Sequence, residues 1–196
     1  MSRSNNLMMI VQINEQIKKI VFKARVINLL ALNAILLSRR AGSLAMGFAF
    51  MSSELRQFSK QLTTQMELLS TQSFHSVTLV SQSQKYDRIN QLLQKTAFST
   101  DHNQLKQRLL NSNHQLDLIK RQTQHEKDKL KASIEEALLM GRFGSIIARS
   151  LKIEATYGDV YTESLTGIAN EFCEHIETIA ATINNLYSNL RSSYQN

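Results

Sequence analysis

The densest cluster of side chains that could bind a metal ion is Cys173-Glu174-His175. Thiolates, carboxylates and imidazoles are all common zinc ligands. On a helix, however, residues two apart are separated by about 200°, so Cys173 and His175 point to different sides and cannot share one ion. We therefore expect no metal site here, and Cys173 is predicted to be a small residue beside the core.

The remaining reactive side chains form no catalytic constellation. No HExxH pattern and no Glu-x-x-His pair of a di-metal helical bundle occurs. The other histidines are dispersed, at His75, His102, His114 and His125. The six glycines are too sparse for a phosphate-binding loop. The sequence therefore predicts neither an enzyme nor a bound cofactor.

The composition favours long helices in a cytoplasmic protein. The 196 residues include no proline, which is the strongest helix breaker. The single cysteine excludes an internal disulfide framework and fits a reducing compartment. The apolar run near the N-terminus is too short for a signal peptide. The run Leu29–Leu37 is interrupted by Asn33 and is too short to cross a bilayer, so we expect no transmembrane segment.

The net charge of +7 would allow nucleic acid or acidic lipid as a partner. The basic residues are scattered rather than arranged in a stripe, most aromatic residues fall outside basic clusters, and no known nucleic-acid-binding motif occurs. A solvated basic surface is the favoured interpretation, and nucleic acid is not the expected partner.

Apolar and small residues recur at alternating spacings of three and four, which is the heptad pattern of coiled-coil helices. The first expected seam is Ile10, Ile13, Ile17, Ile20, Ala24, Ile27, Ala31, Ala34 and Ser38. The second is Phe48, Met51, Leu55, Phe58, Leu62, Leu69, Val77 and Val80. The third, which has a polar gap from 123 to 128, is Leu105, Leu109, Leu116, Ile119, Leu130, Ile134, Ala137, Ile147 and Leu151. The fourth is Leu165, Ala169, Phe172, Ile176, Ile179, Ile183, Leu186 and Leu190.

Glycines are expected to mark two reversals, with Gly42 and Gly47 at the first and Gly158 and Gly167 at the second. They divide the chain into hairpin one (1–96), a connection (97–101) and hairpin two (102–196). The predicted fold is all-α, a single elongated antiparallel four-helix bundle made of two hairpins. It is expected to thin to a two-helix coiled coil away from the turns, with both turns at one end.

Residues 28–62 have the one family resemblance in the chain. The matching letters are NLLALNA at 28–34, RAG at 40–42 and GFA at 47–49, followed by Glu54 and Arg56 in the same ungapped register. They resemble the cytoplasmic signalling hairpin of bacterial methyl-accepting chemotaxis proteins, the chemoreceptors. In that family, the outer surface of the hairpin tip packs receptors together and docks a histidine kinase and its coupling adaptor. The resemblance implies these proteins as partners.

A second apolar stripe lies beside the first seam, at Leu29, Leu32, Leu36 and Leu37. It is either an exposed contact surface or is buried inside the protein. Burying one leucine contributes about 1.5–3 kcal/mol, so four are not expected to remain in water without a partner. The contact residues that the resemblance and this stripe predict are Asn28, Leu29, Leu32, Asn33, Leu36, Leu37, Arg40 and, at the second turn, Glu154.

The chain also departs from the family. Leu37 and Ser43 stand where the family has glutamates, and Met46 stands where it has an arginine. Much of the polar chemistry that would meet the kinase and adaptor is therefore altered. The pair Glu135-Glu136 could suggest adaptational methylation, but its flanking residues fit poorly and such a pair is usually solvated.

The sequence thus predicts a non-enzymatic, chemoreceptor-like signalling or regulatory protein that acts through helical contacts at its tip. A typical chemoreceptor has a membrane span and a sensor domain, and we expect neither here. The alternative is a structural or scaffolding coiled coil that homo-oligomerises through the tip stripe.

Overall fold

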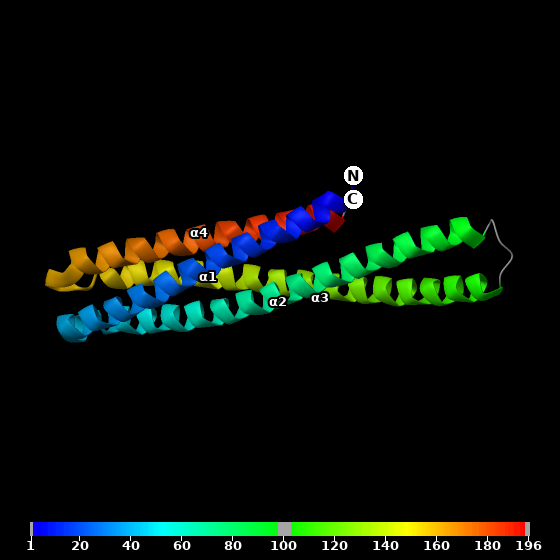
Figure 1. Cartoon of the computed structure of the whole chain (residues 1–196). Helices are drawn as coiled ribbons and strands as arrows, with labels where there is room; N and C mark the ends of the chain where they lie inside the picture. The colour runs from blue at the N-terminus through cyan, green and yellow to red at the C-terminus, as the bar shows by residue number, and fades with distance from the viewer. Residues whose placement is uncertain (1, 98–102, 195–196) are drawn as a thin grey trace. The chain divides into compact units, whose positions relative to one another are not determined.

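The computed structural model describes residues 2–97 and 103–194, and their side chains over 11–96 and 106–191. Within these residues the protein is all-α, as predicted (Figure 1). Its four long helices are α1 (Ser2–Ala41), α2 (Met46–Ala97), α3 (Asn103–Ala155) and α4 (Thr162–Tyr194). Two short 3-10 helices, η1 (Gly42–Ala45) and η2 (Asp159–Tyr161), form the turns. Most of the predicted connection 97–101, together with Ile10 and Leu105 of the predicted seams, lies outside these descriptions.

The chain forms two compact units that do not follow the hairpin boundaries. Unit 1 contains Met1–Ser70 and Lys131–Asn196, and unit 2 contains Thr71–Leu130. Unit 1 therefore includes α1, α4, the first part of α2 and the last part of α3. Unit 2 consists of the remaining parts of α2 and α3.

Contacts between all four helices hold unit 1 together. Helix α1 lies beside α4 over a long stretch (Figure 1). Arg56 of α2 donates a hydrogen bond to the Asn28 side chain of α1, and Gln65 of α2 donates to the Ser133 carbonyl of α3. The thiol of Cys173 in α4 donates to the Ala148 carbonyl of α3. Each helix is thus linked to two others.

The predicted seams of α1 and α4 form the core of unit 1. Every described seam residue from Ile13 to Ser38 is buried, and so is every one from Leu165 to Leu190. In α3, Gly141 faces Ala180 and Ile183 of α4, and Gly144 faces the ring of Phe58 in α2. These glycines therefore allow close helix contacts.

The predicted seam of α2 is only partly correct. Met51, Val77 and Val80 are half-buried. The buried positions that the predicted seam did not include are Ser52, Ser59, Gln65, Met66, Ser73, Ser76, Leu79 and Asn90. Serine is small enough to occupy a seam between closely packed helices, so the heptad continues through residues that look like surface positions in the sequence.

The two turns differ from the prediction in their glycines. Gly42 has φ +77°, a left-handed conformation that favours glycine, and α1 ends directly before it. At the second turn Asp159 adopts the positive φ, of +50°, whereas Gly158 has φ −76°. Gly47 and Gly167 lie inside α2 and α4, so neither forms a turn.

Unit 2 has a mixed apolar and polar interior. Its buried apolar residues are Leu79, Leu116, Ile119 and Leu130. Between them lie buried polar residues, and Asn90 donates a hydrogen bond of 2.8 Å to Asn113 across the two helices. The Ser73, Ser76 and Ser112 hydroxyls are buried without a hydrogen-bond partner. The predicted polar gap is confirmed, since no residue described as buried lies between 120 and 129.

One helical window within Val11–Thr96 is long and apolar enough to cross a membrane, judged by length and composition alone. Only 28% of this window is buried in the protein. Its buried residues belong to the inner seam, so the window combines a packed inner face with an apolar outer face. The outer face is where the candidate site lies.

Candidate functional site

The two turns of unit 1 lie at the same end of the unit (Figure 1). The carboxylate of Glu154, in the last turn of α3, lies against Gly47, in the first turn of α2. A side chain at position 47 would collide with this carboxylate. The structure therefore brings Glu154, which the sequence analysis assigned to the second turn, against the start of α2.

The predicted leucine stripe on α1 is partly exposed. Leu29 is 61% exposed and Leu36 is 58% exposed. Leu32 and Leu37 are half-buried, because they lie closer to the packed side of the helix. Two of the four leucines are therefore exposed, and none of them is fully buried.

The polar residues of the predicted contact set also include both exposed and half-buried side chains. Asn33 and Arg40 are exposed. Asn28 is half-buried, and its side-chain oxygen accepts a hydrogen bond of 3.3 Å from Nε of Arg56. Asn28 thus ties α1 to α2, and this bond restricts its side chain as a partner contact.

Three more apolar residues near the first turn are exposed, and the sequence prediction did not include them. They are Leu44, Met46 and Phe50, each about 60% exposed or more. Met46 stands where the chemoreceptor pattern has an arginine. This departure from the pattern could have identified Met46 as an exposed apolar residue. The surface at this turn is more apolar than the pattern implies.

Helix α3 has an exposed apolar stripe that the sequence prediction missed entirely. Its members lie outside the inner seam, at Leu139, Phe143, Ile146 and Ile153, and Tyr157 extends the stripe into the turn just after the helix ends. Ser150 occupies the position between Ile146 and Ile153. The same spacing rule that identified the inner seam would have found this stripe.

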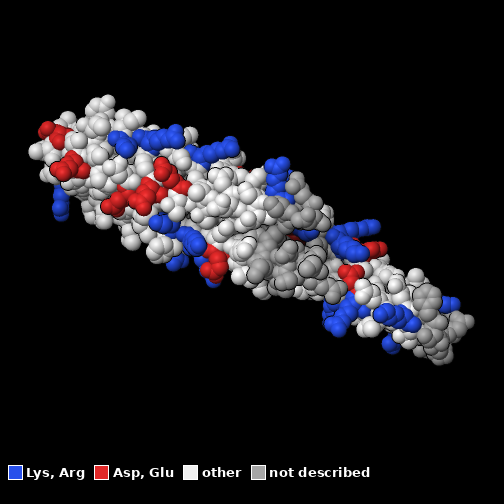
Figure 2. All heavy atoms as spheres, turned by 90° about the horizontal axis from the view of Figure 1, so that it is seen from above, with Lys and Arg blue, Asp and Glu red and all other residues white. Residues whose placement is uncertain are grey.

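Charge is distributed unequally between the neighbouring helices α1 and α4. No Asp or Glu occurs between Glu15 and Glu54, whereas α4 contains four glutamates and no Lys or Arg before Arg191. On the face that Figure 2 shows, acidic side chains gather toward the left of the view and basic side chains border them. The apolar outer face of α1 is therefore accompanied only by positive charge over most of its length.

The side chains of Cys173 and His175 have different neighbours in the fold and do not form one site. Burial raises the pKa of the Cys173 thiol, which makes it a poor nucleophile and a poor metal ligand. Nδ1 of His175 lies 3.1 Å from Nζ of Lys23 on α1. Burial, and then the charge of Lys23, lower the pKa of His175. Among the described residues no group of three or more His, Cys, Asp or Glu side chains could hold a metal ion.

The Glu135-Glu136 pair is exposed on α3. Oε2 of Glu136 accepts a hydrogen bond of 3.1 Å from Gln65 of α2. Glu135 lies 3.9 Å from the amino group of Lys131. Both carboxylates thus have partners within unit 1, as is ordinary for solvated glutamates on a helix.

No family model matches the chain, and neither a curated protein nor a solved structure matches it. The chemoreceptor resemblance of residues 28–62 therefore rests on the residues themselves.

Proposed function

We propose that this chain is a cytoplasmic, chemoreceptor-like signalling or regulatory protein without enzymatic activity, which acts through helical protein–protein contacts at the first turn. In this proposal unit 1 is an antiparallel four-helix bundle and unit 2 is a two-helix coiled coil. The partners are the chemotaxis histidine kinase, its coupling adaptor or chemoreceptors. Because the polar contact residues are altered, the proposal makes no claim that the chain activates a kinase.

The observation that carries this proposal is the exposure of Leu29 and Leu36 beside the first turn. These leucines belong to the segment that resembles the family, and they lie on the face that the family uses for docking. Large apolar side chains that are grouped on a surface mark contact sites for partners. Leu44, Met46 and Phe50 extend the exposed apolar surface around the same turn.

A binding experiment with purified kinase and adaptor tests this function. The wild-type chain is expected to be retained by one of them, and Leu36→Glu is expected to weaken retention by about tenfold or more, because it places a charge in an apolar contact. Leu139→Glu, at an equally exposed leucine of α3, is the matched control and should bind normally. Absence of binding, or equal binding by both variants, rejects the first turn as a chemotaxis contact.

A second candidate function is a scaffold that homo-oligomerises, and the exposed stripe of α3 favours it. Five apolar residues at heptad-like spacing make a surface on which a second helix can pack. Light scattering at increasing concentration tests this function. Ile146→Glu should shift an oligomer toward monomer, whereas a wild-type chain that stays monomeric excludes the scaffold.

A further inference from the structure

The outer face of α1 bears a straight line of apolar side chains. The line starts near the first turn and runs back toward the N-terminal part of the helix. Phe22, Leu29 and Leu36 are spaced seven residues apart, so they lie on the same side of the helix. All three are more than half exposed. At about 1.5 Å per residue the line is about 21 Å long.

Positive charges lie near both ends of this line. The segment between Glu15 and Glu54 contains six basic residues and no acidic one, and the basic residues are Lys18, Lys19, Lys23, Arg25, Arg39 and Arg40. Arg25, Arg39 and Arg40 are exposed and form no ion pair with any described residue. Helical geometry places Arg25 and Arg40 within about 40° of the line through Leu29. The face therefore combines apolar side chains with unneutralised cations.

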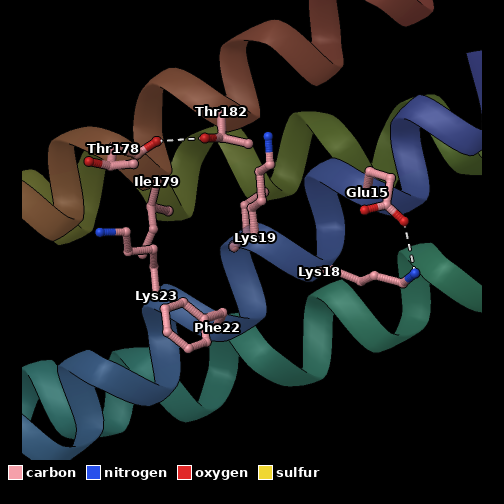
Figure 3. A pocket seen from close by; sticks show the side chains of 9 residues that line it. Glu15, Lys18, Lys19, Phe22, Lys23, Thr178, Ile179 and Thr182 are labelled. Atoms are coloured by element: carbon pink, nitrogen blue, oxygen red, sulfur yellow. Dashed lines mark hydrogen bonds and ion pairs between the residues drawn. The ribbon is translucent and has the colours of Figure 1, made fainter.

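A groove beside Phe22 adds to the positive charge. It lies between α1 and α4, and its charged lining residues are Lys18, Lys19, Lys23 and the single carboxylate Glu15, all of α1 (Figure 3). The ammonium group of Lys18 is 2.8 Å from Glu15, and that of Lys23 lies beside His175. Lys19 is exposed, and its ammonium group extends above α1 in this view.

We propose that the outer face of α1 docks on a membrane surface that contains anionic lipid, with α1 lying in the plane of the membrane. This face shares Leu29 and Leu36 with the proposed kinase or adaptor contact, whereas Phe22 and Arg25 belong to the membrane face alone. Exposed apolar side chains flanked by Lys and Arg are the pattern of a helix that lies at the boundary between lipid headgroups and acyl chains. Anionic headgroups match the cations, and the acyl region accepts Phe22, Leu29 and Leu36.

The inner face of α1 explains why the helix lies in the plane and does not cross the membrane. Ile20, Ala24 and Ile27 are at most 1% exposed, because they pack in the core of unit 1. A helix that crossed a bilayer would have to leave this core and expose the seams of its neighbours. In-plane docking uses the apolar window found within Val11–Thr96 and keeps the core intact.

Sedimentation with lipid vesicles tests the proposal on the whole chain. Vesicles of equal parts phosphatidylcholine and phosphatidylglycerol are compared with vesicles of phosphatidylcholine alone. The protein should sediment with the anionic vesicles only, and added salt should release it, since each basic residue at the surface is worth about fivefold in affinity. Equal binding to both vesicles, or no binding to either, overturns the proposal. Binding that resists both high salt and alkaline extraction indicates a crossing helix and also overturns it.

Matched substitutions assign the binding to α1. Phe22→Gln should lower affinity for anionic vesicles by about tenfold and Arg25→Gln by about fivefold. Phe143→Gln and Arg142→Gln make the same changes at exposed positions of α3 and should have no effect. If the α1 variants bind vesicles normally but lose a protein partner, the face is a protein contact and the proposal is wrong. Neither Phe22 nor Arg25 belongs to the first-turn contact set, so this result is independent of the kinase experiment.

A spectroscopic variant covers the case in which Phe22→Gln fails to fold. The chain contains no tryptophan, so Phe22→Trp introduces a single fluorophore on the docking line. Its emission should shift to shorter wavelength with anionic vesicles, whereas that of Phe143→Trp should stay unchanged. Shifts of equal size in the two variants contradict docking through α1.

Discussion

Helices α1 and α4 lie side by side in unit 1, and they differ on their outer faces but not on their inner faces. Their inner faces are alike, since both bury a complete heptad seam of aliphatic and small residues. Their outer faces are opposite in character. Within its described residues α4 exposes no large hydrophobic residue and carries four glutamates, whereas α1 exposes Val11, Phe22, Leu29 and Leu36 among basic residues.

This difference shows which features of α1 are needed for packing in unit 1 and which are not. Helix α4 shows that a helix in this unit can be built without large apolar side chains exposed on its outer face. The apolar outer face of α1 is therefore not required for packing in unit 1. Since large exposed apolar side chains lower solubility, their grouping on α1, as on α3, is best explained by surfaces that they contact.

The largest expected effect is a loss of stability on truncating a buried residue. It tests whether the inner faces of α1 and α4 contribute equally to the core. Ile27→Ala in α1 and Ile176→Ala in α4 remove the same atoms from positions that are 0% and 1% exposed. Each should lower the free energy of unfolding by about 2–5 kcal/mol, through lost burial and the remaining cavity. Urea denaturation followed by circular dichroism measures both. A loss below about 1 kcal/mol in one helix only would show that the two seams do not contribute equally to one core.

A smaller effect is expected from overpacking the inner face of α1. Ala31 is fully buried, so Ala31→Leu has to displace its neighbours and should cost about 1–3 kcal/mol. Ala181→Leu, at an exposed position of α4, is the control and should change stability by less than about 0.5 kcal/mol. Thermal unfolding distinguishes them. Equal melting temperatures would mean that α1 has room on its inner side, contrary to the close packing described here.

How far the sequence predicted the fold depends on the residues that form each seam. The seam of α4 was predicted completely because it consists only of Leu, Ile, Phe and Ala. In α2 the seam passes through Ser52 and Ser59, whose hydroxyls donate to the Phe48 and Arg56 carbonyls of their own helix. Such internal hydrogen bonds let serine be buried at little cost, so polarity does not reveal its position.

The sequence indicated which part of α1 to consider as a candidate site, but not which of its side chains are exposed. The family resemblance and the second stripe pointed to the end of α1, and Glu154 does lie against Gly47 there. Which leucines are exposed depends on the angular positions of α2 and α4 around α1, and heptad spacing does not specify these. The α3 stripe has the same spacing as an inner seam and was missed because a second stripe was sought only on the first helix.

The smallest expected effect is a change in the pH dependence of stability, caused by the polar contact between Lys23 of α1 and His175 of α4. His175 has a pKa below its ordinary value of 6.5, because it is partly buried and lies beside Lys23. The unfolded chain therefore takes up a proton first as the pH falls, so stability should decrease below about pH 6.5, down to the lowered pKa of the folded state. Protonation also removes the Nδ1 acceptor that faces Nζ of Lys23 and places two cations together.

His175→Gln should reduce this part of the pH dependence while leaving stability near pH 8 almost unchanged. Melting temperatures measured from about pH 8 to about pH 5 provide the comparison, with His114→Gln on the exposed surface of unit 2 as the control. The effect should be small, because His175 retains considerable contact with solvent. If wild type and His175→Gln lose stability in parallel as the pH falls, the Lys23–His175 contact does not link α1 to α4 in solution.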